Sequence, residues 1–242
     1  MSAYLSEFLG TMLLILLGDG VCCAVSLNKS KAQNSGWIVI AFGWALAVAI
    51  PVYIFGPIGG AHFNPAVTLG MAAIGKIAWS MVPGYIGCQM AGAILGAVLV
   101  YLMYKPHFDV TEDKATKLGV FCTAPAIKDT PFNFISEFIG TFVLVFTILG
   151  VGNTTSVDGF GPFIVGLIIL VIGLSLGATT GYAINPARDL GPRIAHAILP
   201  IKDKGDSDWG YAWLPVIAPI CAGICAALIF TLLSVSYTHL RA

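Results

Sequence analysis

Charged residues are scarce in this chain. Asp, Glu, Lys and Arg make up 10% of its 242 residues, whereas a soluble domain carries about 25%. Hydrophobic residues reach 57%, and the mean hydropathy is +0.89. The formal net charge is zero, so no excess of either sign points to nucleic acid or another charged partner. The composition excludes an ordinary soluble domain and indicates an integral membrane protein.

Metal-binding and disulfide patterns are also missing. The six cysteines and four histidines show no spacing typical of a metal site or a disulfide framework. Five cysteines lie within apolar runs and Cys122 is alone in a polar loop, so we interpret them as small buried hydrophobic residues. The few histidines and the scattered cysteines do not form the pair of nucleophile and base that an enzyme active site would need. We therefore expect no metal, no other cofactor and no enzymatic activity.

Long apolar runs dominate what is present. Each is close to the ~20 residues that an α-helix needs to cross a ~30 Å hydrocarbon core. They cover residues 4–27, 37–55, 82–104, 132–151, 161–179 and 211–234. The first run is too long for a signal-peptide core and follows no basic segment, so we expect it to be retained. The fold class predicted is an all-α integral membrane protein with six transmembrane helices in the cell membrane.

The chain also repeats itself. The stretch "SEFLGTMLLILLG" at 6–18 matches "SEFIGTFVLVFTI" at 136–148, and "GAHFNPAVTLG" at 60–70 matches "GYAINPARDLG" at 181–191. Each half contains three spans. Because three is odd, the second half must be inserted upside down relative to the first, and such inverted repeats place the working site near the bilayer midplane.

These repeats define the expected domain organisation. We predict a single channel domain over residues 1–242, with repeat 1 at about 4–104, repeat 2 at about 132–234 and a joining loop at 105–131. A duplication with only a structural meaning is the alternative. The last stretch, "SVSYTHLRA", matches nothing in the first half, and we assign it no function.

The repeated Asn-Pro-Ala triplets predict two helix starts. Asparagine is a strong N-cap, and proline is favoured at the next position. The triplets are Asn64, Pro65 and Ala66, and Asn185, Pro186 and Ala187. The helical pattern that follows lasts only to about Gly75 and about Ile198. Ten to twelve residues make roughly 15–18 Å, about half the hydrocarbon core, so two half-helices meeting N-terminus to N-terminus would complete a seventh span.

Irregular stretches are expected before each half-helix, at Phe55–Phe63 and Thr179–Ile184. Such backbone is tolerated at membrane depth only where protein buries it or a wet cavity lies beside it. Its carbonyls would line that cavity, and the candidates are Gly60, Ala61, His62, Gly181, Ala183 and Ile184. Glu7 and Glu137 would accept hydrogen bonds from the loops and brace them, unless they merely lie near the interface.

The expected site rejects ions. Each helix N-terminus carries roughly half a positive charge, which opposes cations but not neutral molecules. Arg188 follows Asn185 by three positions and so shares its helix face, whereas Val67 takes that place in the first half. The alternative for Arg188 is a pair with Asp189 alone. Together these features predict a pore for neutral, hydrogen-bonding solutes.

The paired triplets with the arginine resemble the aquaporin and glycerol-facilitator family, over about residues 3–234. The resemblance implies six helices plus two half-helices, a pore in each protomer and a homotetramer in the lipid bilayer. Trp44, Gly173 and Asp189 match glycerol-facilitator marks, and Tyr182 stands where the family often has phenylalanine. The resemblance thus implies a filter of Trp44, Gly173, Tyr182 and Arg188, in which Gly173 supplies width.

The resulting functional hypothesis is a passive channel for glycerol and similar small neutral solutes, with some flow of water. A strict water channel is the alternative within the family. A coupled transporter is the alternative from another class, and it would need a titratable group at the midplane. His62 is read as a hydrogen bonder in its loop, and Asp19 is expected near the far interface.

Overall fold

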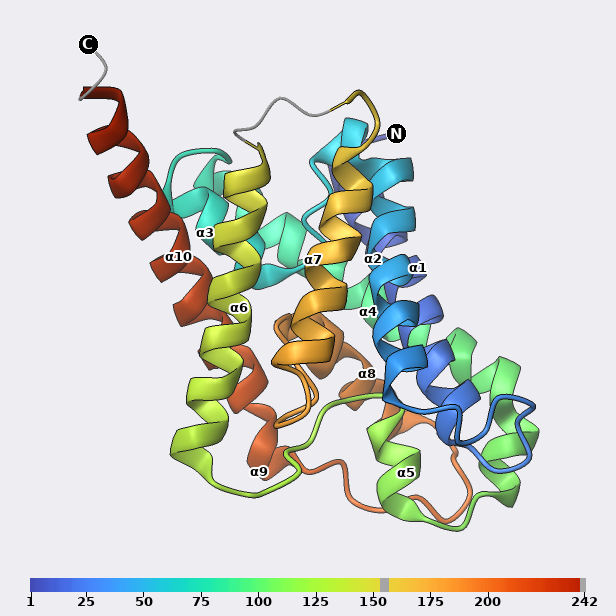
Figure 1. The fold of residues 1–242 in the computed structure, drawn as a ribbon. Coiled ribbons are helices and arrows are strands. Elements are labelled where there is room, and N and C mark those ends of the chain that lie inside the picture. The colour runs from blue at the N-terminus through green and yellow to red at the C-terminus, as the bar shows by residue number, and fades with distance from the viewer. Residues whose placement is uncertain (153–156, 240–242) are drawn as a thin grey trace.

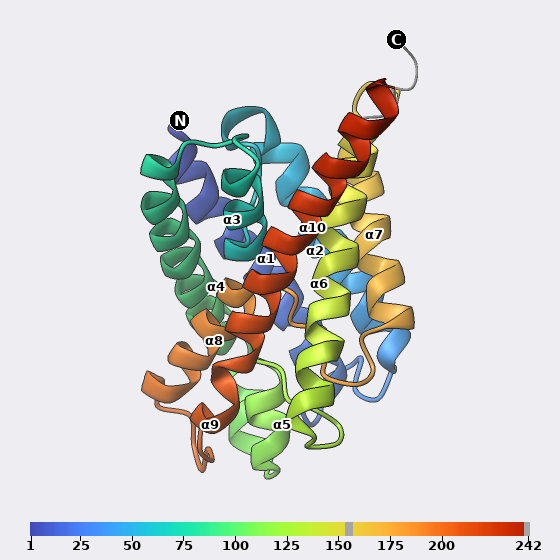
Figure 2. The same ribbon diagram turned by 90° about the vertical axis from the view of Figure 1, so that its left-hand side faces the viewer.

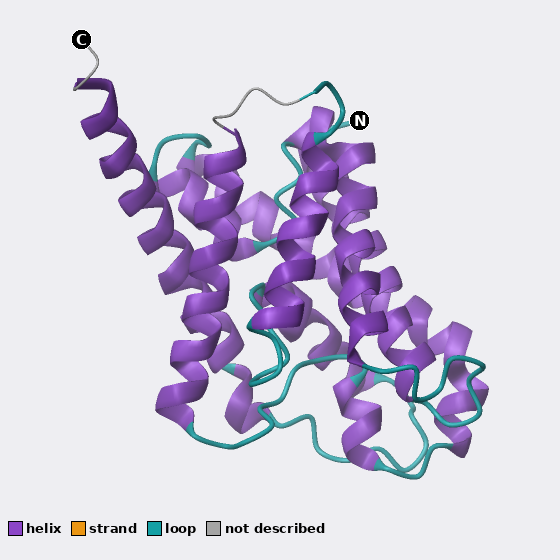
Figure 3. Cartoon of the chain, in the orientation of Figure 1, coloured by secondary structure: helices purple, strands orange, loops and turns teal. Residues whose placement is uncertain are grey.

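The computed structural model describes residues 1–152 and 157–239, with the backbone only for residues 235–239. Throughout that part of the chain the structure consists of helices and loops without strands (Figure 1, Figure 3). The three final residues of "SVSYTHLRA" lie outside the described residues, and the helix before them runs to His239. The all-α fold expected from the sequence is confirmed.

Five of the described helices are long and apolar enough to cross a bilayer. They are α1 (Ala3–Ser26), α2 (Trp37–Gly59), α4 (Val82–Val110), α6 (Thr130–Gly152) and α10 (Leu214–His239). The sixth expected span is α7 (Gly161–Ser175), which has 15 residues. It is shorter than the predicted run of residues 161–179, because residues 176–180 leave the helix as turns that lead into the second Asn-Pro-Ala segment.

Two half-helices follow the Asn-Pro-Ala triplets, α3 (Pro65–Ala73) and α8 (Pro186–Ile198). Each packs against a helix from the other half of the chain: α3 against α10, and α8 against α4 (Figure 2). The glycines of the repeated Leu-Gly pair permit this contact. A Cβ at Gly70 would lie 2.7 Å from the Gly223 carbonyl oxygen, and one at Gly191 would lie 2.5 Å from the Ala93 Cβ. The two halves are therefore interlocked.

The first irregular stretch is shorter than predicted. We expected it at Phe55–Phe63, but α2 continues to Gly59 and contains both Pro51 and Pro57. Each proline removes only one backbone donor, and the packed helix tolerates that loss. The helix ends at Gly60, whose φ of 79° forms a left-handed cap with its N–H donating to the Gly56 carbonyl. A glycine cap, rather than the prolines, sets this boundary.

Short elements cover one end of the bundle, opposite the N-terminus (Figure 1). They include α5 (Lys114–Gly119) and α9 (Trp209–Ala212), which the sequence did not predict. Lys204 Nζ donates to the carbonyls of His196, Ala197 and Leu199 at the end of α8. A cation suits a helix C-terminus. Cys122 lies in the loop between α5 and α6 and is 1% exposed, as expected for a small buried hydrophobic residue.

Candidate transport pore

Two cavities enter the bundle from opposite ends. The first has a volume of about 410 Å³ and is bordered by Lys76 and Gly152, at the end where α6 finishes (Figure 1). The second has a volume of about 280 Å³ and is bordered by Thr116 and Gly119 of α5, at the covered end. Three residues border both cavities: Trp44, Tyr182 and Arg188. These three side chains therefore stand between the two cavities.

The two half-helices meet at the asparagines. Asn64 Nδ2 donates to the Ile184 carbonyl and Asn185 Nδ2 donates to the Phe63 carbonyl, both at 2.9 Å. The Oδ1 atoms cap the half-helices, accepting from Ala66 N–H at 2.9 Å in one and from Ala187 N–H at 3.0 Å in the other. Each amide has a second hydrogen, and both asparagines border the first cavity. A solute in this cavity would meet two fixed donors.

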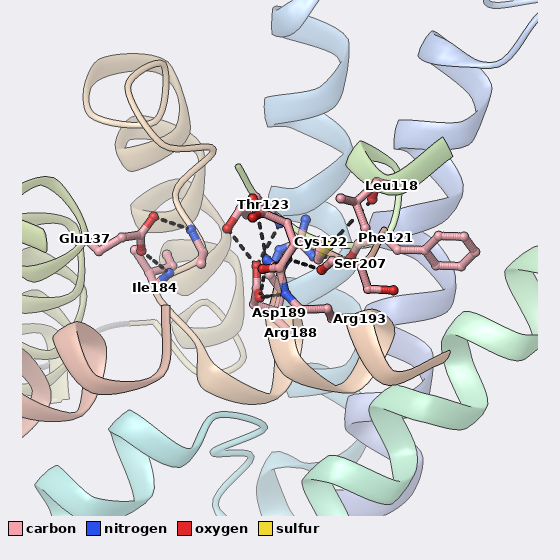
Figure 4. A network of polar contacts seen from close by, with 12 residues as sticks. Leu118, Phe121, Cys122, Thr123, Glu137, Ile184, Arg188, Asp189, Arg193 and Ser207 are labelled. Carbon is pink, nitrogen blue, oxygen red and sulfur yellow. Dashed lines mark hydrogen bonds and ion pairs between the residues drawn. The ribbon is translucent and has the colours of Figure 1, made fainter. Parts of the chain in front are cut away.

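A carboxylate braces each loop in the same way. Glu7 accepts from the N–H groups of His62 and Phe63 at 2.8 and 2.7 Å. Glu137 accepts from those of Ala183 and Ile184 at 2.9 and 2.8 Å (Figure 4). Both carboxylates are buried. Since buried polar groups need partners, these hydrogen bonds explain why glutamate is repeated in two apolar helices, and they argue against an interfacial position.

The bracing continues into a third contact for each carboxylate. Gln89 Nε2 donates to Glu7, and Thr180 Oγ1 donates to Glu137, both at 2.7 Å. The repeated glycine serves the same loops: a Cβ at Gly10 would overlap the Phe63 ring, and one at Gly140 would lie 3.0 Å from Ile184 Cγ2. Residues of the repeated Ser-Glu-Phe and Gly-Thr segments therefore hold the residue that precedes each Asn-Pro-Ala triplet.

The loops adopt costly backbone conformations. Positive φ values occur at Ala61 (50°), Phe63 (48°), Tyr182 (40°) and Ile184 (43°). Such values in residues other than glycine cost about 1–3 kcal/mol each and persist only where the surroundings enforce them. Of the six expected carbonyl positions, five border the first cavity: Gly60, Ala61, His62, Ala183 and Ile184. Gly181 borders the second. The Ile184 carbonyl already accepts from Asn64.

His62 lies beside the first loop. Its Nδ1 is 3.1 Å from Thr68 Oγ1, and Thr68 in turn accepts from Gln89 Nε2 at 2.9 Å. The imidazole thus belongs to the hydrogen-bond network around Glu7. No group of three or more potential metal ligands occurs in the described residues.

Arg188 is held by three contacts. Its Nη1 donates to the Phe121 carbonyl at 2.9 Å (Figure 4) and lies 3.4 Å from Asp19 Oδ1. Its guanidinium carbon sits 4.0 Å from the centre of the Trp44 ring, close enough for a cation–π interaction. Asp189, the alternative partner, pairs with Arg193 at 2.8 Å instead. Asp19, expected near the far interface and given no role, is fully buried beside Arg188.

Gly173 has a different position from the one predicted. We expected it to widen the filter, but it borders neither cavity. A Cβ at this position would lie 3.0 Å from Tyr182 Cζ and 3.1 Å from Tyr182 Oη. Trp37 completes the arrangement: its Nε1 donates to the Gly173 carbonyl at 2.9 Å, and its ring makes an edge contact with Tyr182 at 5.7 Å. The absence of a side chain at Gly173 therefore leaves space for the ring of Tyr182, on the side of Gly173 that the ring occupies.

Sequence reasoning missed Asp19 and Trp37 as parts of this site. A signal existed for Asp19, because an ionisable residue inside an apolar helix normally has a partner and a role. Its partner, Arg188, is 169 positions away, and no local pattern joins them. Trp37 gave no signal, since an aromatic residue at the start of a transmembrane helix is ordinary at a membrane interface.

The helices, the facing half-helices and the two cavities define a membrane channel with a three-sided constriction. The chain belongs to the major intrinsic protein family, whose model matches residues 1–230. It is 59% identical over 230 residues to the "Probable glycerol uptake facilitator protein" of Thermotoga maritima, covering 95% of this chain and 98% of that protein.

Two further comparisons agree with this assignment. The chain is 57% identical over 223 residues to the glycerol uptake facilitator protein of Bacillus subtilis, covering 92% of this chain and 81% of that one. The X-ray structure of the aquaglyceroporin from Plasmodium falciparum superposes with a TM-score of 0.81 at 30% identity, covering 94% and 93% of the two chains. The protein is thus a multi-pass channel of the cell membrane.

Proposed function

We propose that this protein is a passive channel for glycerol and other small neutral solutes, with some permeation of water. One observation carries the proposal: Trp44, Tyr182 and Arg188 together border both cavities. Two aromatic rings offer an apolar surface to the carbon edge of a polyol, and the guanidinium offers donors to its hydroxyl edge. The names of the relatives from Thermotoga maritima and Bacillus subtilis support glycerol as the solute.

The same geometry supports the exclusion of ions and protons. The N-termini of α3 and α8 face each other across Asn64 and Asn185, and both carry partial positive charge. The junction is made of two neutral amides, which do not titrate. A coupled transporter would need a titratable group at that place, so this alternative is disfavoured. A strict water channel is disfavoured by the two aromatic rings, which suit carbon-bearing solutes.

We further propose that the chain forms one channel unit from two inverted repeats, as the paired Glu7 and Glu137 braces suggest. A homotetramer in the bilayer is the proposed assembly. The outer face of α2 is a surface that such an assembly could use, because Ile38, Phe42, Leu46 and Ile54 are between 51% and 63% exposed. Such a face requires lipid or another protomer.

Light scattering from proteoliposomes tests the proposed function. A glycerol gradient should cause rapid shrinkage followed by reswelling as glycerol enters, at a rate proportional to the amount of protein. A gradient of an impermeant osmolyte should cause shrinkage alone, and its rate reports the permeability to water. Water flow without glycerol entry would instead establish the strict water channel.

Trp44 is predicted to set the upper size limit for polyols. Trp44→Ala should raise the permeability to a five-carbon polyol, relative to glycerol, by about ten-fold, the scale on which apolar pockets discriminate by one or two methylene groups. The reason is that the ring is 4% exposed and borders both cavities. Reswelling rates for a series of polyols measure the effect.

Trp79→Ala is the matched control, because Trp79 is 58% exposed and borders neither cavity. It should leave the size limit unchanged. An unchanged limit in Trp44→Ala as well would remove Trp44 from the filter.

A further inference from the structure

Asp19 is a buried carboxylate that borders neither cavity and contacts the filter through Arg188. It lies within α1 and is 0% exposed, and its Oδ1 is 3.4 Å from Arg188 Nη1. Its Oδ2 has no hydrogen-bond partner among the described residues. A buried charge without a partner is strongly unfavourable, so the arginine is what allows an ionised carboxylate here.

Asp189 cannot take over this role. Its Oδ1 accepts from Arg193 Nε at 2.9 Å and its Oδ2 accepts from both the N–H and the hydroxyl of Thr123 at 2.7 Å (Figure 4). Both oxygens are occupied, and the charge of Asp189 is compensated by Arg193. Within the described residues, Arg188 therefore forms its ion pair with Asp19.

The contacts of Arg188 also fix its orientation. A guanidinium carries five N–H groups, and the two on Nη1 point to Asp19 Oδ1 and the Phe121 carbonyl. Nε and Nη2 make no hydrogen bond to any described residue. They are not among the buried polar atoms without a partner, so they are accessible. Arg188 borders both cavities. The Nε–Nη2 edge therefore faces the lumen. That edge presents parallel donors, which match the adjacent hydroxyls of a vicinal diol.

We propose that Asp19 is a specificity-determining positioning residue of the filter. It anchors Nη1, so that the opposite edge of the guanidinium faces the solute, and it cancels the charge of Arg188, so that the constriction is close to neutral. The inference rests on the proposed function for the identity of the solute. The charge balance that it describes is independent of glycerol.

A specific consequence distinguishes this proposal from a simple positive barrier. In Arg188→Val, Asp19 loses the cation that keeps it ionised, so the buried carboxylate takes up a proton. The space left by the guanidinium connects this titratable group to the lumen. The variant should conduct protons at about ten-fold or more above the wild type, because the positive charge of Arg188 is gone and a carboxyl group can bind and release protons there. In the double variant Asp19→Asn/Arg188→Val, the titratable group is gone as well, and most of that leak should disappear.

The test compares wild type, Asp19→Asn, Arg188→Val and the double variant in proteoliposomes. Proton flux is followed with an internal pH-sensitive dye under a K⁺ diffusion potential, and solute flux by light scattering. Asp19→Asn keeps an acceptor of the same shape but loses the charge. It should show no cation leak, a lower glycerol permeability relative to water, and an increased permeability to a small anion such as formate.

Asp109→Asn makes the same chemical change outside both cavities and should match the wild type in every assay. Equal leaks in Arg188→Val and the double variant would overturn the proposal, as would an Asp19→Asn variant with unchanged anion and glycerol permeabilities. If Asp19→Asn does not fold, the two arginine variants still decide, since replacing both members of a buried ion pair is usually tolerated. Failure of the wild type to pass glycerol would refute the proposed function and leave this leak comparison intact.

Discussion

Glu137→Gln is expected to lose most of the channel activity and to melt at a lower temperature than the wild type. The carboxylate accepts from the N–H groups of Ala183 and Ile184 and from the Thr180 hydroxyl. Glutamine offers one acceptor oxygen and turns an NH₂ group toward the remaining donor. An unsatisfied buried donor costs about 1–3 kcal/mol, and it releases a loop that already contains positive φ values at Tyr182 and Ile184.

Size-exclusion chromatography after heating should show the apparent melting temperature falling by roughly 5 °C or more. Stopped-flow scattering should show glycerol permeability per molecule falling by about ten-fold or more, as a shift of ~1.4 kcal/mol between open and collapsed loops would produce. Glu7→Gln should behave similarly, because Glu7 holds His62 and Phe63 in the same way. Glu112→Gln, at an exposed position, is the control. A wild-type melting temperature in Glu137→Gln would show that the loop does not depend on the carboxylate.

The equivalence of Glu7 and Glu137 was predictable because both lie in the same short motif, which is repeated in the two halves of the sequence. Each repeat carries Ser-Glu-Phe and Gly-Thr at a fixed spacing, and each carries Asn-Pro-Ala before a short helical pattern. Capping and the cost of irregular backbone in a bilayer are local rules. They were enough to predict two half-helices starting after Asn64 and Asn185, and the caps form at these asparagines.

What could not be predicted depends on packing between distant segments. Asp19 meets Arg188 because α1 and α8 contact each other and both pack against α4. The extension of α2 to Gly59 is likewise a balance between two prolines, which favour an earlier end of the helix, and a glycine cap at Gly60. The sequence alone does not show which of these effects is stronger. Sequence periodicity predicts the helices of such a bundle, whereas the packing of the helices determines which side chains lie together along the pore.

Gly173 shows how this limits functional reasoning. The resemblance to the family implied that Gly173 supplies width to the filter. In the structure, the space beside Gly173 is filled by the ring of Tyr182, whose exposed fraction is 7%. The hydroxyl of Tyr182 has no partner among the described residues, although the residue borders both cavities. We therefore expect the glycine to act on the pore through the position of this ring.

Gly173→Val is accordingly expected to close the pore to glycerol more than to water. Added methyl groups would meet Tyr182 Cζ and Oη on one side and Ala41, whose Cβ lies 3.3 Å from the new Cβ, on the other. The α7 backbone has little freedom to retreat, because Trp37 holds the Gly173 carbonyl and α2 packs against α7. The ring must then move toward the lumen. Overpacking of about 1–3 kcal/mol predicts a fall in glycerol permeability of about ten-fold or more.

The second substitution Tyr182→Ala tests that reasoning directly. In Gly173→Val/Tyr182→Ala, the space vacated by the ring accepts the valine, and glycerol permeability should return to within a few-fold of the wild type. Gly87→Val is the matched control, because a Cβ there meets nothing within 4 Å and the position is exposed. Reswelling rates normalised to the folded protein in each preparation measure all three variants. If Gly173→Val closes the pore and the double variant stays closed, the valine itself blocks the lumen, and Gly173 supplies width directly rather than through Tyr182.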